Sequence, residues 1–155
     1  MALFYRVETS HPDRSERKGA YRPMVNKELG SEYDTVAGMA GLDSADFQRH
    51  PLPQNDARLF KDWESICYND EERNFLFGFS DLLQFLSWFY DKAGRSRITN
   101  HAVVAIYEVP DCYMHLGQFQ AIAHFEHMVH VKDLCPLTLQ EADPEKFKHW
   151  TNCQN

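Results

Sequence analysis

Three histidines at three-residue intervals have the spacing that most directly suggests chemistry. His124, His127 and His130 form the pattern His-x2-His-x2-His, and imidazoles at this interval can converge on one helical face and bind zinc. The surrounding residues have the pattern of a strand that runs into a loop. In a strand, His124 and His127 would point to opposite faces. The sequence therefore favours structural or surface histidines over a metal site, which stays open as the alternative, and predicts no cofactor.

Arg6 is the second candidate, because it lies inside a predicted strand between Tyr5 and Val7. A guanidinium in apolar surroundings requires an acidic partner or a ligand, since an unpaired buried charge is costly. Two interpretations stay open. One is an ion pair with a carboxylate of the chain. The other is a phosphate, carboxylate or ribose ligand, which the planar fork of Arg suits.

The sequence lacks the motifs of several common enzyme classes, namely G-x-S-x-G, the P-loop and G-x-G-x-x-G. Its four cysteines lie far apart with no C-x-x-C pair, and nothing singles out one of them as a nucleophile. Neither a signal peptide nor an apolar run long enough to cross a membrane is present. Reduced thiols and a cytoplasmic protein are the expectation.

Charge is distributed unevenly over the 155 residues, whose formal net charge is −7. Residues 28–81 contain twelve acidic and four basic side chains, a net charge of −8. This balance argues against direct nucleic-acid binding, which depends on Lys and Arg. It permits an acidic surface that attracts a basic partner, or a merely solvated surface. The predicted partner-binding residues are Asp43, Asp46, Asp62, Glu64, Asp70, Glu71 and Glu72.

The elements that must position these residues follow from hydrophobic periodicity. Strands are predicted near residues 3–8, 74–79, 102–109 and 118–125, all in one, mostly antiparallel sheet. A helix is predicted at about 80–93, with Ser80 as its N-cap and Gly94 just beyond its end. The segment 102–109 is apolar on both faces, which is typical of a central strand.

The remaining segments are less regular. Residues 9–31 are polar and predict a surface loop, residues 59–66 a short helix, and Asp143-Pro144 the start of a last helix. The sequence thus predicts a single α+β domain over 1–155 with long irregular loops.

Several short motifs resemble one family in type and order. They are Tyr5-Arg6-Val7-Glu8, Gly19-Ala20-Tyr21-Arg22, Arg49-His50-Pro51-Leu52-Pro53, Phe77-Gly78-Phe79-Ser80 and Gly117-x-x-Gln120. This order resembles small phage- and prophage-encoded proteins that open Tyr-Arg-Val-Glu and continue Gly-Pro-Tyr-Arg, although Ala20 replaces the usual Pro. The resemblance covers roughly residues 4–125. It implies an accessory gene of a mobile element, and accessory phage proteins of this size often counter bacterial immunity, anti-CRISPR proteins among them.

A second resemblance is to compact ADP-ribosyltransferases. In that family an early strand carries Arg, an aromatic strand ends in Ser before a helix, and a late strand follows a loop. The resemblance implies that Arg6, Ser80 and Gln120 are catalytic and that NAD is the cofactor. The family usually has Glu at the late position, where this chain has Gln118 or Gln120.

The leading functional hypothesis is therefore an anti-defence protein of the anti-CRISPR kind, in the cytoplasm of the bacterial host. Its expected partner is an immune protein complex that binds nucleic acid, with no direct contact to nucleic acid or membrane. The alternative is an ADP-ribosyltransferase-like enzyme that modifies a host immune protein.

Overall fold

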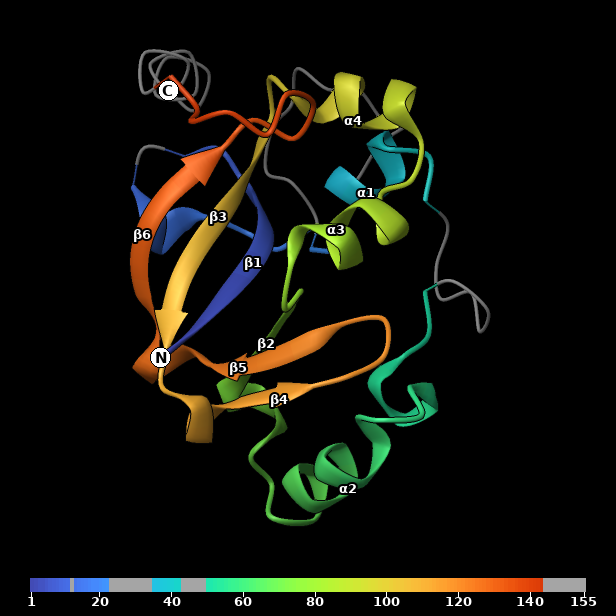
Figure 1. Cartoon of the computed structure of the whole chain (residues 1–155), viewed down its shortest axis with the longest axis vertical. Coiled ribbons are helices and arrows are strands. Elements are labelled where there is room, and N and C mark those ends of the chain that lie inside the picture. Colours follow the sequence, from blue (N-terminus) through green and yellow to red (C-terminus); the bar gives the residue numbers. More distant parts are fainter. Residues whose placement is uncertain (12, 23–34, 43–49, 144–155) are drawn as a thin grey trace. The chain divides into compact units, whose positions relative to one another are not determined.

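Strands and short helices follow one another along residues 1–11, 13–22, 35–42 and 50–143, the part of the chain that the computed structural model describes (Figure 1). Two three-stranded antiparallel sheets and several helices form an α+β fold, so the predicted fold class is confirmed. The strands are β1 (Ala2–Thr9), β2 (Phe75–Gly78), β3 (Ala102–Val109), β4 (Met114–Leu116), β5 (Ala121–His124) and β6 (Val129–Leu134). The α-helices are α1 (Val36–Met39), α2 (Phe60–Tyr68), α3 (Leu82–Trp88) and α4 (Lys92–Ile98). The 3₁₀ turns are η1 (Arg14–Glu16), η3 (Pro53–Asn55), η4 (Glu72–Asn74), η5 (Asp111–Tyr113) and η6 (Phe125–His127).

β3 is the central strand of the first sheet, between β1 and β6 (Figure 1). Residues 102–106 are all buried, as the apolar pattern on both faces predicts. β1 contains the predicted strand 3–8. The third strand, β6, was not predicted, although Val129 and Val131 alternate there with polar residues.

The second sheet has the order β2-β5-β4, with both pairs antiparallel. Side chains alternate between its faces along each strand. One face packs on α2, where Leu59 and Ile66 form a core with Phe75 and Ile122. Ala121, Ala123 and Met114 belong to a second core, which also contains Phe4 and Val109. Each large apolar side chain buried in this way contributes about 1.5–3 kcal/mol.

The prediction that all strands share one sheet was wrong. β5 pairs with β4 across the short connection 117–120, because antiparallel neighbours joined by few residues close the smallest loop. β1 meets the end of β2 at one bridge only, where Tyr5 and Phe79 exchange two backbone hydrogen bonds of 2.9 and 2.7 Å. A Cβ at Gly78 would overlap the Tyr5 carbonyl oxygen, so this close approach requires glycine.

The predicted helix at 80–93 is two helices. α3 ends at Trp88, because Phe89 leaves the helical region at φ −94° and ψ 61°. α4 begins after Asp91, whose carboxylate accepts a hydrogen bond from the Ala93 N–H at 3.2 Å. Gly94 was predicted to follow the helix end but lies inside α4, where a Cβ would overlap the Ala40 carbonyl oxygen. The apolar run continues through residues 89 and 90, so hydrophobic periodicity could not show the break.

The N-cap of α3 is Asp81 rather than Ser80. The Asp81 carboxylate accepts a hydrogen bond from the Gln84 N–H at 2.8 Å, and the Gln84 side chain accepts one from the Ser80 N–H at 2.9 Å. This reciprocal arrangement satisfies two backbone donors at the start of the helix.

Replacing Asp81 by alanine is expected to lower the free energy of unfolding by about 1 kcal/mol, because one helix N–H loses its acceptor. Ser80→Ala is the matched control and should change it by less than about 0.5 kcal/mol. Urea unfolding of the two single variants measures the difference. A larger loss for Ser80→Ala would contradict the assignment of the cap.

The described residues group into two units, whose segments alternate along the chain. One unit contains the described residues of Met1–Arg6, Ser44–Tyr90 and Ile106–Val131. The other contains those of Val7–Asp43, Asp91–Ala105 and Lys132–Asn155, and in it α1 packs on α4. The single domain over 1–155 stays a prediction. The helix predicted at Asp143-Pro144 extends outside the described residues.

Candidate functional site

Five of the seven predicted partner-binding carboxylates lie on α2, on η4 or between them. All five are exposed, and we call them the α2–η4 acidic surface: Asp62, Glu64, Asp70, Glu71 and Glu72. Two basic residues, Lys61 and Arg73, lie within residues 60–74, against these five carboxylates. Asp43 and Asp46 lie outside the described residues.

The amphipathic character of α2 turns these carboxylates outward. Ile66 and Trp63 pack toward the sheet, which leaves Glu64 and Tyr68 on the solvent side. Asp70, Glu71 and Glu72 follow the C-terminal end of α2, where the helix dipole disfavours negative charge. Asp70 also has a positive φ of 55°, which is uncommon for a residue other than glycine. The helix dipole disfavours the negative charges of residues 70–72, and a positive φ is uncommon for Asp70. Neither the stability of α2 nor the local backbone preference therefore explains why these acidic residues lie here.

Two further side chains distinguish this surface. Tyr68 is 91% exposed, although tyrosine commonly packs part of its ring against the protein. At the other end of α2, the Asp62 carboxylate lies 3.2 Å from Nδ1 of His115 on β4. Tyrosine is an enriched anchor residue in protein interfaces, so the exposed Tyr68, close in sequence to the acidic run, is a feature of a binding surface.

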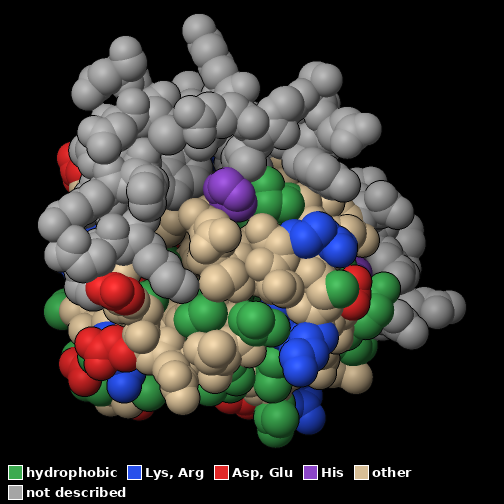
Figure 2. Space-filling view, turned by 90° about the horizontal axis from the view of Figure 1, so that it is seen from above, with side chains coloured by type: hydrophobic (Ala, Val, Ile, Leu, Met, Phe, Trp, Pro, Cys, Tyr) green, Lys and Arg blue, Asp and Glu red, His purple; other side chains and the backbone are tan. Residues whose placement is uncertain are grey.

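Not every acidic residue of the 28–81 block contributes to a surface. Asp56 is fully buried, and its carboxylate accepts hydrogen bonds from the backbone N–H groups of Gln118, Phe119 and Arg58. Figure 2 shows a face on whose described part acidic and basic side chains occur close to one another, among hydrophobic side chains and other atoms. The formal charge of the block therefore overstates its acidic surface.

The three residues of the transferase hypothesis have different environments. Arg6 is half-buried on β1, and Ser80 follows β2. Gln120 is 4% exposed, and its side-chain N–H donates to the Pro51 carbonyl oxygen at 2.7 Å. This bond uses the Gln120 amide within the fold. A catalytic role for the three residues stays a prediction.

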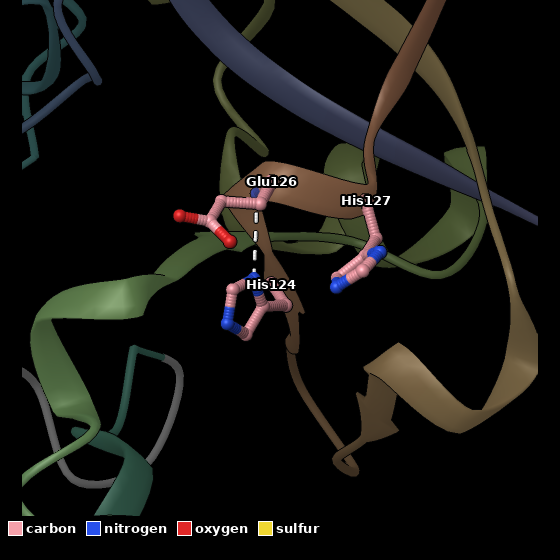
Figure 3. Close-up of side chains that lie close together, drawn as sticks. All are labelled: His124, Glu126 and His127. Atoms are coloured by element: carbon pink, nitrogen blue, oxygen red, sulfur yellow. Dashed lines mark hydrogen bonds between the residues drawn. The ribbon is translucent and has the colours of Figure 1, made fainter.

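The first two histidines of the His-x2-His-x2-His pattern come together, and the third does not. β5 ends at His124, and η6 follows at once, so His124 and His127 lie on one side of a 3₁₀ turn with Glu126 beside them (Figure 3). The two imidazole rings have centroids 5.0 Å apart. His130 lies on β6 and packs on the Tyr107 ring at 5.5 Å. The strand predicted at 118–125 is longer than β5. Residues 118–120 belong to the turn before it, and residue 125 is the first residue of η6.

Residues 1–136 match the family described as Bacteriophage T4 Y00F protein, which is more than half of the chain. The chain belongs to this family. The predicted resemblance to small phage-encoded proteins is confirmed at that level. No curated protein and no solved structure matches this Y00F-family protein.

The matched range of the Y00F family includes both the α2–η4 acidic surface and the pair His124 and His127. Among the described residues, no helix combines the length and the apolar character needed to cross a membrane.

The three described cysteines of the Y00F-family protein are free thiols. Desolvation and the nearby Glu72 carboxylate raise the pKa of the exposed Cys67 thiol. Burial raises the pKa of the Cys135 thiol, but hydrogen bonds from Thr138, Leu137 and Thr99 outweigh it, so the pKa lies below its usual value. Cys135 is only 9% exposed, which restricts access to the thiolate.

Proposed function

We propose that this Y00F-family protein is an anti-defence protein of the anti-CRISPR kind. It binds a bacterial immune complex through the α2–η4 acidic surface and blocks the basic channel in which that complex holds nucleic acid. The observation that carries the proposal is the exposed acidic run after α2, beside the exposed ring of Tyr68. The run lies where the helix dipole disfavours it, so helix stability does not explain its position.

Attraction between an acidic surface and a basic channel affects how fast the two proteins associate. Opposite charges steer two proteins toward each other before contact, and this raises the association rate constant. Screening at physiological salt limits the attraction to about 8 Å. Binding should therefore weaken as salt is added, mostly through slower association.

Charge reversal tests the proposal. Glu71→Lys with Glu72→Lys should slow association with the immune complex of the natural host by about tenfold at low salt, and the rate should depend less on salt than in the unchanged protein. The matched control is Glu108→Lys with Glu141→Lys, which reverses two exposed charges that do not belong to this surface. Surface plasmon resonance at two salt concentrations measures both rates, with the immune complex captured from host lysate.

The same captured immune complex also tests whether the protein acts as a competitive inhibitor or as an enzyme. An inhibitor that occupies the nucleic-acid channel must compete with target DNA and act at stoichiometric amounts. If the carboxylates only keep the protein soluble, both double variants bind alike and inhibition is intact. Labelling of a host protein from NAD by substoichiometric amounts, lost in Arg6→Ala, would support the transferase instead.

A further inference from the structure

His124 and His127 come together because the chain changes from a β-strand to a 3₁₀ turn between them. Along a strand they would face opposite sides, but the strand ends at His124, and residues 125–127 form the 3₁₀ turn η6. In a 3₁₀ turn, side chains at i and i+3 lie above one another. Glu126 extends from the same turn, and one ligand atom of each of the three residues lies within 4.8 Å of the others (Figure 3).

Aromatic neighbours hold the two imidazole rings in place. The Tyr113 ring stacks on His127, with centroids 3.5 Å apart and planes 7° apart. Phe75 meets His124 edge to face at 5.3 Å, and Phe125 stacks beside it at 5.8 Å. Imidazole coordinates a metal in the plane of its ring, so a ring stacked on its face, as Tyr113 is on His127, does not block its nitrogen atoms. Rings held in this way lose little freedom when they bind.

From this arrangement we propose that His124, Glu126 and His127 bind one Zn²⁺ ion. Two imidazoles and a carboxylate are a zinc donor set with three protein ligands, which leaves a fourth position for water. Zn–N and Zn–O bonds are about 2.0–2.2 Å long, so two ligand atoms can lie at most about 4 Å apart. The three ligand atoms already lie within 4.8 Å of one another, so small side-chain movements bring them to this limit.

One hydrogen bond is lost when the metal binds. Nδ1 of His124 accepts a weak bond from the Glu126 N–H at 3.3 Å. A metal on Nδ1 takes the accepting lone pair, and a metal on Nε2 requires the ring proton on Nδ1. The Glu126 amide proton therefore reports on the site in either case.

Calorimetric titration of the untagged, metal-free chain with zinc chloride tests the proposal. We expect one Zn²⁺ per chain, and at least about tenfold weaker binding for His124→Ala and for His127→Ala. His130→Ala is the matched control, because it removes the third histidine of the pattern and should change the affinity less than about twofold. His115→Ala tests in the same way whether the histidine beside Asp62 contributes.

Nuclear magnetic resonance of the unchanged protein makes the test independent of variant folding. Zn²⁺ should shift the imidazole signals of His124 and His127 and the amide signal of Glu126, while the signals of His130 stay in place. No zinc binding, or equal weakening by His130→Ala and His127→Ala, would overturn the proposal. Zinc-dependent shifts confined to His115 or to the cysteines would overturn it too.

Discussion

Replacing Arg17 by methionine is expected to lower the free energy of unfolding by about 3–5 kcal/mol, because it removes a cation that two largely buried carboxylates share. The guanidinium forms a bidentate pair with Asp133 at 2.9 and 3.0 Å, and Nη1 lies 3.6 Å from Glu8. Its Nε–H donates to the His11 carbonyl oxygen at 2.9 Å. The side chains of Arg17, Glu8 and Asp133 are only 4%, 3% and 11% exposed, so water screens these charges little.

Urea unfolding of Arg17→Met beside Arg14→Met measures this effect. Arg14 begins the 3₁₀ turn η1 that Arg17 caps, but it is exposed, so its replacement should change the free energy of unfolding by less than about 0.5 kcal/mol. Adding Glu8→Gln to Arg17→Met should recover part of the loss, since one buried negative charge is removed. Equal stability of the two single variants would show that the buried pair contributes nothing.

Replacing Asp56 by alanine should cost about 3 kcal/mol, because three backbone donors lose a charged acceptor inside the protein. The Asp56 carboxylate is fully buried and accepts from the N–H groups of Gln118 at 2.7 Å, Phe119 at 2.9 Å and Arg58 at 3.1 Å. It thereby holds the turn between β4 and β5 against the chain before α2. A Cβ at Gly117 would lie 2.6 Å from this carboxylate, so the turn packs directly on it.

Two measurements check the role of Asp56. Asp56→Asn keeps one oxygen acceptor and should be less destabilised than Asp56→Ala in urea unfolding. In both variants the amide protons of Gln118 and Phe119 should exchange faster with solvent. Asp111→Ala is the control, since Asp111 is 80% exposed and its contact with the N-terminal amine spans 3.7 Å. Unchanged protection of both amides in Asp56→Ala would contradict this role.

Local pattern was sufficient for several elements of this protein. The apolar stretch 102–109 predicts β3 with its observed bounds, and Phe75–Gly78 lies within the predicted strand 74–79. Their signals are local, because periodicity and β-propensity act on neighbouring residues. The same holds for α2, which begins and ends within two residues of the predicted helix at 59–66.

The arrangement of strands in sheets and the partners of buried charges depended on residues far apart in the chain. β5 pairs with β2 and β4, and β6 takes the place beside β3, since pairing is a competition among all strands. Arg17, in a segment that predicts a surface loop, finds Asp133 from 116 positions away. Nothing local marks such a pair, because the low dielectric that makes it necessary exists only after folding.

For both candidate sites, the sequence indicated the residues, and the fold decided which of them lie together at the surface. Charge counting along the sequence located the exposed carboxylates of α2 and η4, but it could not show that Asp56 in the same block is buried. The histidine spacing drew attention to His124 and His127, but in a continuous strand their side chains would have pointed to opposite faces. Only the end of β5 at His124, followed by a 3₁₀ turn and the stacked ring of Tyr113, places both imidazoles side by side, because backbone geometry decides which face a side chain occupies.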